Sequence, residues 1–502
     1  MQIKTLIAQL QNAQVHGALD REISGIAYDS RQVKPGTLFV AMRGEKVDGH
    51  DFINSAANQG AAAIVVERTE PNRDITTIVV PDSRAALADL AAVYFQQPAQ
   101  HLKMTGVTGT NGKTTFTFLL KHICERAMLR CGLLGTVRYE IGDRHLPATR
   151  TTPESLDVQE MLFQIRSAGC RATVMEVSSH ALVQERVRGI EWDAAVFTNL
   201  TQDHLDFHGT MEKYFESKAR LFTGLASQKR KRGTAVINGD DRYGVRLAEI
   251  VEKHGVPVVT YGLGARADVR ASNVKIDFAG TSYQLEAGGK IFLVRLPLIG
   301  RFNVYNSLAA IAAAPALGVD LRTAVLSLAD APSVPGRLEA VPVKRAFRIF
   351  VDYAHTDDAL INVMKTLREL SPNRLIVVFG CGGNRDRAKR PKMGAAVDQL
   401  ADWAIITSDN PRKEKPEAII EEVQRGFQGR SYEIIVDRKE AIHRAVAMAQ
   451  PRDIILIAGK GHETYQEFAD HTVPFDDVDV ARRAVEERPV EVSKGREQAK
   501  DQ

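Results

Sequence analysis

The stretch Gly106–Thr115, with the sequence GVTGTNGKTT, constrains the fold more than any other part of the chain. An apolar-edged approach at residues 101–107 predicts a short strand, and the residues after Lys113 have the apolar spacing of a helix. A strand, a glycine-rich turn and a helix opening on Lys-Thr form a phosphate cradle, because backbone N–H groups point at the anion. The spacing departs from GxxxxGK[ST], whose first glycine would fall on Val107. Such turns also occur without nucleotides, but Gly-Lys-Thr-Thr favours a nucleoside triphosphate with Mg²⁺.

Length and composition narrow the class of protein. A chain of 502 residues is too long for one core, so about two to four domains are expected. The net charge of +4 comes from dispersed basic residues, which argues against a nucleic-acid or membrane-surface partner. We expect a soluble cytoplasmic protein, because no signal peptide or membrane-spanning apolar run is visible. The four cysteines show no CxxC spacing and are expected to be reduced thiols.

The pattern of strands and helices predicts an α/β fold with three domains. Residues 1–98 read as a small α/β domain, and residues 99–338 as a central P-loop-type ATPase domain with a parallel sheet. Residues 339–492 alternate buried strands with helices and predict a Rossmann-like C-terminal domain. Residues 493–502 form a polar tail that we expect to be disordered.

Two groups in the central domain are candidates for chemistry. Glu176 lies inside the apolar strand pattern of residues 172–180, where a carboxylate is costly unless it is paired or metal-bound. We predict that it binds Mg²⁺ at the carboxyl end of its strand; the alternative is a buried arginine partner. The next predicted strand leads into a loop crowded with polar residues, which are Asp203, His204, Asp206 and His208.

Two basic features of the same domain give no functional signal on their own. Lys218 lies in a helical pattern whose periodicity predicts an ordinary solvated lysine. The run KRKR at residues 229–232 predicts a solvated loop rather than a nucleic-acid patch. In the third domain, by contrast, polar loops follow the strands, where ligands of parallel sheets bind. These loops carry Asp352, His355, Arg385, Asp409–Arg412 and Glu463, and the arginines suit an anionic substrate.

Taken together, these motifs resemble the Mur ligase family over nearly the whole chain. The resemblance is carried by TGTNGKTT (108–115), MEVSSHAL (175–182), NLTQDHLDFHG (199–209), YFESKARLF (214–222), GRFNVYNSLAA, PGRLE, DYAHT and GKGHE. It implies a cytoplasmic, ATP-dependent amide ligase of peptidoglycan synthesis, and with it a role in cell-wall growth, cell shape and division. The implied reaction adds meso-2,6-diaminopimelate to UDP-N-acetylmuramoyl-L-alanyl-D-glutamate through an acyl phosphate.

The resemblance also implies roles for individual residues. Lys113, Glu176, His204 and Lys218 would be catalytic. Thr114 and Glu176 would bind one Mg²⁺, while His204 would share a second with Lys218 in a carbamoylated, carboxylate-like form. The remaining ATP contacts would be Gly109, Thr110, Asn111, Gly112, Lys113, Thr114, Thr115, Asn306, Arg337 and Asp352.

The UDP-linked substrate would meet two sets of residues. Its nucleotide-sugar end would contact Tyr28, Ser30, Glu45, Lys46 and Val47. Its peptide end would contact Arg150, Thr151, Thr152, Ser178, Gln184 and Arg186, although some relatives carry Asn in place of Arg150.

Acceptor choice would depend on the motif Asp409-Asn410-Pro411-Arg412. Diaminopimelate is a lysine with an extra carboxylate, for which Arg385 and Arg412 offer a cationic fork. Gly459 and Glu463 would bind the amino and carboxylate groups at the same distal centre. The chain departs from the family at Asp357, where DYAHTP is common.

The sequence leaves other activities open. These are the same ligation with L-lysine, a folylpolyglutamate-type ligase, and a P-loop switch that couples nucleotide state to a partner. The folate alternative gives no reason for the first domain or for the DNPR motif. We expect a monomer that binds neither nucleic acid nor membrane.

Overall fold

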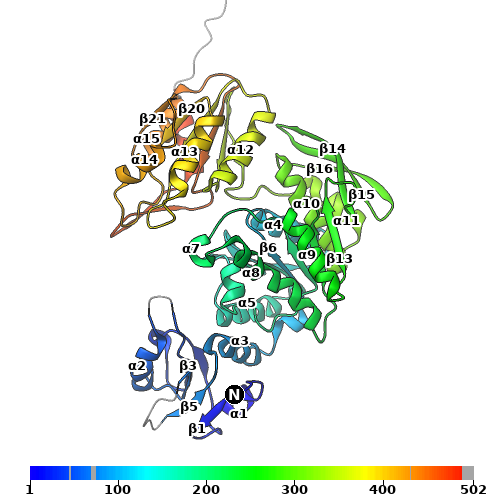
Figure 1. Cartoon of the computed structure of the whole chain (residues 1–502), viewed down its shortest axis with the longest axis vertical. Coiled ribbons are helices and arrows are strands. Elements are labelled where there is room, and N and C mark those ends of the chain that lie inside the picture. The colour runs from blue at the N-terminus through cyan, green and yellow to red at the C-terminus, as the bar shows by residue number, and fades with distance from the viewer. Residues whose placement is uncertain (45–46, 69–74, 430, 489–502) are drawn as a thin grey trace, which may run out of the picture. The chain divides into compact units, whose positions relative to one another are not determined.

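The computed structural model describes residues 1–44, 47–68, 75–429 and 431–488 (Figure 1). It forms two compact units, each of which is described by itself. The first comprises Met1–Lys275, Ser282–Pro297 and Phe302–Pro332, and the second Ile276–Thr281, Leu298–Arg301 and Ser333–Gln502. Glu45, Lys46 and the tail 493–502 lie outside the described residues. Within the described ranges, every helix is too short or too polar to cross a membrane.

The first unit begins with a five-stranded sheet in the order β1-β5-β4-β3-β2. Only β1 is antiparallel to its neighbour, and β3, β4 and most of β5 are buried, as expected for a parallel sheet covered on both faces. The strands are β1 (Gln14–His16), β2 (Gly25–Ala27), β3 (Thr37–Val40), β4 (Ala63–Val66) and β5 (Thr76–Val79). The helices are α1 (Ile3–Ile7), α2 (Ile53–Asn58) and α3 (Ser83–Tyr94).

The second sheet of this unit has eleven strands in the order β16-β15-β14-β13-β12-β11-β6-β10-β7-β8-β9. Its middle, from β13 to β7, is parallel throughout. The strands are β6 (Lys103–Thr108), β7 (Cys131–Leu134), β8 (Arg138–Ile141), β9 (Arg144–Pro147), β10 (Ala172–Glu176), β11 (Ala194–Phe197), β12 (Thr234–Asn238), β13 (Val258–Gly262), β14 (Val269–Asp277), β15 (Gly280–Ala287) and β16 (Lys290–Leu296). The helices are α4 (Lys113–Arg126), α5 (Ser155–Ser167), α6 (Ser179–Val183), α7 (Leu205–His208), α8 (Met211–Thr223), α9 (Arg242–Lys253), α10 (Arg301–Ala313) and α11 (Leu321–Ser327).

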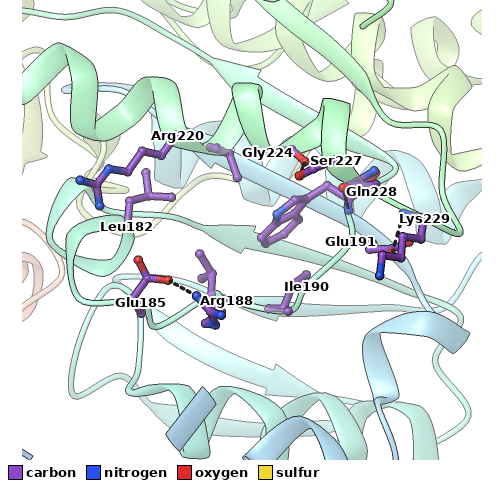
Figure 2. Close-up of a pocket in the computed structure, with 14 residues that line it drawn as sticks. Leu182, Glu185, Arg188, Ile190, Glu191, Arg220, Gly224, Ser227, Gln228 and Lys229 are labelled. Carbon is purple, nitrogen blue, oxygen red and sulfur yellow. Dashed lines mark hydrogen bonds and ion pairs between the residues drawn. The ribbon is translucent and has the colours of Figure 1, made fainter. Parts of the chain in front are cut away.

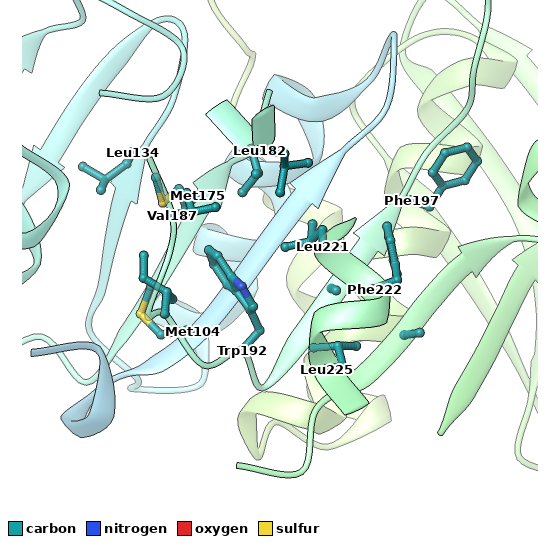
Figure 3. Packing of buried hydrophobic residues seen from close by; sticks show 14 of the residues in the cluster. Met104, Leu134, Met175, Leu182, Val187, Trp192, Phe197, Leu221, Phe222 and Leu225 are labelled. Carbon is teal, nitrogen blue, oxygen red and sulfur yellow. The ribbon is translucent and has the colours of Figure 1, made fainter. Parts of the chain in front are cut away.

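A hydrophobic core holds the parallel strands of this sheet against α8 (Figure 3). Met104 of β6, Met175 of β10 and Phe197 of β11 are fully buried, and Phe222 of α8 packs edge-on against Phe197. Trp192, just before β11, is buried in the same cluster. Burial on this scale stabilises each large side chain by about 1.5–3 kcal/mol, so the core fixes the strands whose ends carry the candidate site.

The second unit contains a six-stranded sheet in the order β17-β18-β22-β19-β20-β21, parallel except for β17. This confirms the α/β prediction for the C-terminal part. The strands are β17 (Glu339–Ala340), β18 (Arg348–Asp352), β19 (Leu375–Phe379), β20 (Trp403–Ile406), β21 (Tyr432–Ile434) and β22 (Ile454–Ala458), with a separate hairpin of β23 (Tyr465–Glu467) and β24 (Thr472–Pro474). The helices are α12 (Asp357–Glu369), α13 (Lys389–Leu400), α14 (Pro416–Gln424), α15 (Arg438–Met448) and α16 (Asp477–Glu487).

Candidate active site

The glycine-rich loop joins β6 to α4, as the sequence predicts. Lys113 is the first residue of α4, and its ammonium group donates to the carbonyl oxygens of Gly109 at 2.9 Å and Thr110 at 2.8 Å. The side chain therefore lies across its own loop at the helix N-terminus. A cation and a row of backbone N–H groups at one point suit a phosphate chain.

Two glycines in the loop are required by its geometry. Gly109 has a φ of 150°, and a Cβ there would lie 1.9 Å from Oγ1 of Thr198. Gly112 has a φ of 90°, and a Cβ there would lie 2.4 Å from Oδ1 of Asn306. The second contact brings Asn306 of α10 beside the loop. Any other residue at these positions would displace the loop or its neighbours.

The end of β11 braces the loop from one side, a function that the sequence analysis missed. The hydroxyl of Thr198 donates to the carbonyl of Asn111 at 2.7 Å. The Asn199 side chain accepts from the backbone N–H of Asn111 at 2.9 Å and donates to its carbonyl at 3.1 Å. These bonds fix the loop before any ligand binds. In the sequence, the only sign of this contact is the polar pair Thr198 and Asn199 directly after β11.

Glu176 is the last residue of β10 and is fully buried. It lies beside Val107 of the neighbouring strand β6, which leads into the loop. Its carboxylate accepts from the backbone N–H and from the hydroxyl of Thr136, both at 2.9 Å. No ion pair to Glu176 occurs among the described residues, so the alternative of a buried arginine partner is wrong. Thr136 was not singled out from the sequence.

Lys218 is the clearest departure from what periodicity predicts. Its side chain is only 2% exposed, and its ammonium donates to the carbonyl of Gly109 at 3.0 Å. It also lies 4.5 Å from the ring centre of Tyr214. Burial, together with the nearby charge of Lys113, lowers the pKa of Lys218 well below its ordinary value. The prediction of a solvated lysine is therefore wrong.

The polar residues 203–208 after β11 form α7 and the turn before it. His204 has a φ of 53°, and its ring lies 4.9 Å from that of His180 and 6.2 Å from that of Tyr214. Burial lowers the pKa of His204 to about 4, so the imidazole is neutral near pH 7. His208 is buried and lies 2.9 Å from the hydroxyl of Ser179. A neutral imidazole is the form that can bind a metal ion.

The residues around the loop suit Mg²⁺ better than a metal held by protein ligands alone. Within the described ranges, no group of three or more His, Cys, Asp or Glu side chains could hold a metal ion. Mg²⁺ usually takes only one or two protein carboxylates and completes its coordination with phosphates and water. A buried carboxylate without a cationic partner, as at Glu176, fits such an ion.

The predicted peptide-end residues come together next to Glu176. Thr152 donates to the carbonyl of Glu176 at 2.9 Å, and its hydroxyl accepts from the backbone N–H of Ser178 at 3.1 Å. The hydroxyls of Thr151 and Thr136 lie 3.1 Å apart. Arg186 donates to the carbonyl of Thr152 at 2.9 Å and to the side chain of Gln184 at 2.6 Å.

A nearly buried carboxylate, Glu154, organises the arginines beside this cluster. Arg186 lies 2.9 Å from it, Arg84 of α3 lies 3.9 Å from it, and Arg150 also pairs with it. Three cations around one anion leave net positive charge, which favours an anionic ligand. Neither Glu154 nor Arg84 was singled out from the sequence, because their pairing depends on the contact between α3 and α5.

The predicted nucleotide-sugar residues lie on the first sheet. Tyr28 follows β2 and donates from its hydroxyl to Asp157 of α5 at 2.8 Å. Burial, followed by the charge of Asp157, raises the pKa of Tyr28. Ser30 begins a short 3-10 turn that is capped by Asp29, and Val47 is 56% exposed. The structure does not bring Val47 into contact with the cluster at Thr152.

In the second unit, Asp352 ends β18 and is buried against Arg337. Its carboxylate accepts from the backbone N–H of Leu338 at 2.6 Å and of Ala354 at 2.8 Å. Burial raises the pKa of Asp352 to about 6, although the charge of Arg337 acts in the opposite direction. The guanidinium of Arg337 stacks 4.7 Å from the ring centre of Tyr353. Arg337 and Asp352 are thus neighbours.

The two predicted acceptor-binding arginines both lie beside Gly382 in this unit. A Cβ on Gly382 would lie 3.1 Å from Nη1 of Arg412 and 3.8 Å from Cγ of Arg385. Arg412 is held by bonds to the Glu467 carboxylate at 2.8 Å and the Gly383 carbonyl at 2.9 Å. Both side chains next to this glycine end in a guanidinium group, which binds carboxylates through paired hydrogen bonds.

A second polar network lies at the end of β22. The amide of Asn410 donates to Glu463 at 2.8 Å, and the buried Lys460 donates to Asn410 at 2.9 Å and to Glu463 at 3.0 Å. Gly459 has a φ of 116°, and a Cβ there would lie 2.5 Å from Asp409. The structure therefore brings Asp409, Asn410, Gly459 and Glu463 together. Lys460 was not predicted.

Comparison with known proteins agrees with this geometry. Three family models match the chain: "Mur ligase family, catalytic domain" over residues 22–95, "Mur ligase middle domain" over 107–314, and "Mur ligase, glutamate ligase domain" over 336–461. Together they support the three-domain architecture expected from the sequence.

Full-length relatives extend the match to nearly the whole chain. A UDP-N-acetylmuramoyl-L-alanyl-D-glutamate–2,6-diaminopimelate ligase of Geobacillus thermodenitrificans is 45% identical, covering 97% of this chain and 100% of the relative. The enzyme of the same name from Geobacter sulfurreducens is also 45% identical, with 95% and 97% covered. A solved structure of a ligase of this name is 36% identical, with a TM-score of 0.69 and 97% and 99% covered. This chain belongs to the Mur ligase family of ATP-dependent amide ligases.

Proposed function

We propose that this protein adds meso-2,6-diaminopimelate to UDP-N-acetylmuramoyl-L-alanyl-D-glutamate at the expense of ATP, in peptidoglycan precursor synthesis. The observation that supports diaminopimelate as the acceptor is the pair Arg385 and Arg412. Both side chains have an atom within 4 Å of the position that a Cβ on Gly382 would take. Diaminopimelate differs from lysine by one carboxylate, which this pair can bind; lysine has no such group to offer the pair. The relatives named above, at 45% identity, support the same acceptor.

The reaction we infer has two steps. A carboxylate oxygen of the terminal D-glutamate attacks the γ-phosphorus of ATP, ADP leaves, and an acyl phosphate forms. The free amine of diaminopimelate then attacks the acyl carbon, phosphate leaves with the C–O bond electrons, and the nitrogen loses a proton. Lys113 shields the approaching carboxylate from the phosphate charge, since two like charges 4 Å apart repel by about 4 kcal/mol at intermediate dielectric.

Mg²⁺ would supply the remaining charge neutralisation for phosphoryl transfer. We propose Thr114 and Glu176 as ligands of one ion, and His204 with carbamoylated Lys218 as ligands of a second. The lowered pKa of Lys218 favours its neutral amine, which can attack CO₂ and form a carbamate with loss of one proton. The product is an anion, which the half-buried cation Lys113 would stabilise.

We assign the two ends of the UDP-linked substrate to separate surfaces of the first unit. The nucleotide-sugar end would bind near Tyr28, Ser30 and Val47, with Glu45 and Lys46 outside the described residues. The peptide end would bind the cluster of Arg150, Thr151, Thr152, Ser178, Gln184 and Arg186. The net positive charge around Glu154 supports binding of the peptide carboxylates there.

A mass measurement of the product tests the proposal. The protein is incubated with ATP, Mg²⁺ and the UDP-muramoyl dipeptide, with diaminopimelate and L-lysine offered in parallel. We expect a new product with the added mass of diaminopimelate less water, and little or none with lysine. Phosphate release that no amino acid stimulates, without a new product, would instead support a P-loop switch. If the lysine product forms as readily as the diaminopimelate product, the assignment of diaminopimelate as the acceptor is wrong.

We also infer that the protein works in the cytoplasm as a monomer, with no nucleic-acid or membrane partner. Its ATP and UDP-linked substrate are cytoplasmic molecules, and all four cysteines are free thiols. Light scattering during gel filtration tests the monomer, because a dimer would elute with twice the mass of 55.3 kDa.

A further inference from the structure

A cavity of about 640 Å³ opens at the edge of the central sheet where its parallel strands begin. Lys103 starts β6, Arg171 precedes β10, and Asp193 precedes β11; all three line the cavity. The phosphate loop and Glu176 follow the opposite ends of β6 and β10. A six-residue strand spans about 17 Å, so this cavity is separate from the candidate active site.

The cavity is strongly cationic. Lys103, Arg171, Arg230, Lys231 and Arg232 line it, against the single carboxylate of Asp193. That carboxylate already pairs with Lys231 at 2.7 Å and Lys103 at 3.2 Å. Within the ranges that the structure describes, the side chains of Arg171 and Arg232 have no hydrogen bond or ion pair, and both are exposed.

One carboxylate holds the backbone of the basic run 229–232 in place. The carboxylate of Glu191 accepts from the backbone N–H groups of Lys229 at 3.1 Å, Arg230 at 3.0 Å and Lys231 at 2.9 Å. Figure 2 shows Glu191 beside Lys229 at the rim of a neighbouring pocket. Arg230 also donates to the side chain of Gln100, and Lys231 donates to the carbonyl of Leu102 and to Asp193. Among the described residues, Arg232 is therefore the cation of this run that lines the cavity without a partner.

The neighbouring pocket provides a contrast. It has a volume of about 440 Å³, and its charged lining is more evenly divided, because Glu185 and Glu191 accompany Arg188, Arg220 and Lys229 (Figure 2). Arg188 pairs with Asp89 at 3.0 Å and with Glu185 at 3.6 Å, while Glu191 is bound to backbone N–H groups. The excess of positive charge is therefore larger in the first cavity, where it comes from separate segments.

We propose that the cavity at the strand-start edge binds a soluble small molecule carrying two or more phosphate groups. Arginine binds phosphate oxygens through paired hydrogen bonds, and Arg171 and Arg232 supply two such groups from different segments. Leu129 and Leu317 add an apolar wall that suits the body of such a molecule. A volume of this size is typical of small-molecule sites, whereas an extended polyanion is bound by a long charged stripe.

Calorimetric titration with tripolyphosphate, in a buffer without divalent cations, tests the site. Four proteins are compared: wild type, Arg171→Glu/Arg232→Glu, the matched control Arg266→Glu/Lys275→Glu, and Lys113→Ala. The control makes the same change of net charge at exposed positions away from the cavity. Circular dichroism and thermal melts check that each protein folds, and Arg171→Gln/Arg232→Gln replaces the reversal if it does not.

We expect wild type and control to bind tripolyphosphate at the cavity, and the Arg171/Arg232 variant to bind there at least about tenfold more weakly. Lys113→Ala should keep this binding, which separates it from the phosphate loop and from the ligase proposal. Equal binding by the Arg171/Arg232 variant and the control would overturn the site. Tighter binding to RNA or to anionic lipid vesicles, lost in the same variant, would overturn the small-molecule assignment.

Discussion

Lys218 illustrates how burial changes the chemistry of a single residue. Its position in α8 places the amine against the carbonyl of Gly109, which the amine of Lys113 also contacts. Burial and, after it, the repulsion between the two ammonium groups lower the pKa of Lys218, so its neutral form becomes accessible. Lys213, in the same helix, is exposed.

We predict that Lys218→Ala and Lys218→Arg both lower kcat by at least about a hundredfold, because neither can form a carbamate that binds a metal. The control Lys213→Ala should leave kcat within about twofold, because substitutions of exposed residues usually have small effects. Steady-state kinetics with saturating substrates checks this. Near-normal kcat in Lys218→Arg would show that the positive charge, rather than the carbamate, is what matters.

At the acceptor site, Arg412→Ala should raise the apparent KM for diaminopimelate by roughly tenfold to a hundredfold while the KM for ATP stays nearly constant. One charged hydrogen-bonded pair is worth about 1.5–3 kcal/mol, which corresponds to that range. In the structure, Arg412 already donates to the Glu467 carboxylate and to the Gly383 carbonyl, which hold it in position. An unchanged KM for diaminopimelate would contradict the assignment.

At the scale of elements, the loops before α13 and α14 depend on one buried side chain. Arg390 of α13 is fully buried and pairs with Glu414 at 2.9 Å and Glu422 at 2.8 Å. Its bonds hold the pKa of Glu414 at about 2, and it also donates to the carbonyl of Gly382 at 3.3 Å. Arg390 therefore ties together the two loops that carry Arg385 and Arg412.

We expect Arg390→Met to raise the KM for diaminopimelate by roughly tenfold with a smaller change in the KM for ATP, because the arginine fork loses its alignment. The control is Arg387→Ala, since Arg387 pairs with the same Glu422 but is 68% exposed. It should have little effect, as exposed pairs contribute about 0–1 kcal/mol. Equal effects of the two variants would argue against a positioning role.

Asp352, at the end of β18, makes the stability of the second unit depend on pH. The pKa of Asp352 is raised to about 6 from 3.8, so the folded state binds this proton more tightly than the unfolded state does. The free energy of unfolding must then fall as pH rises from about 4 to 7, by up to about 3 kcal/mol. Asp352→Asn should lack this slope. Denaturant titrations at several pH values check it, and parallel curves for both proteins would contradict it.

Several elements could be predicted from sequence because their signals are local. The phosphate loop is recognised from its glycines, Lys113 and the strand and helix patterns beside them. Glu176 stands out because it is a carboxylate within an apolar strand pattern. Asp357, where relatives have proline, begins α12, a position that suits both residues. Lys218, Glu154 and Arg390 were missed, because their burial or pairing depends on elements distant in the chain. The fold class and the family are confirmed.

At the scale of the whole molecule, two compact units imply that unfolding is not a single two-state process. We predict at least two transitions in differential scanning calorimetry. An ATP analogue should raise the transition of the first unit, which contains the phosphate loop, because ligands stabilise the state that binds them. Lys113→Ala should lose that shift. One sharp transition that moves as a whole would show that the units unfold together.

The chain has only two tryptophans, Trp192 in the core beside β11 and Trp403 at the start of β20. They fall in different units, so each unit carries its own intrinsic fluorophore. With Trp403→Phe, all tryptophan emission would report on the first unit, without any attached dye. With Trp192→Phe instead, the emission would report on the second unit, so the unfolding of each unit could be followed separately by fluorescence.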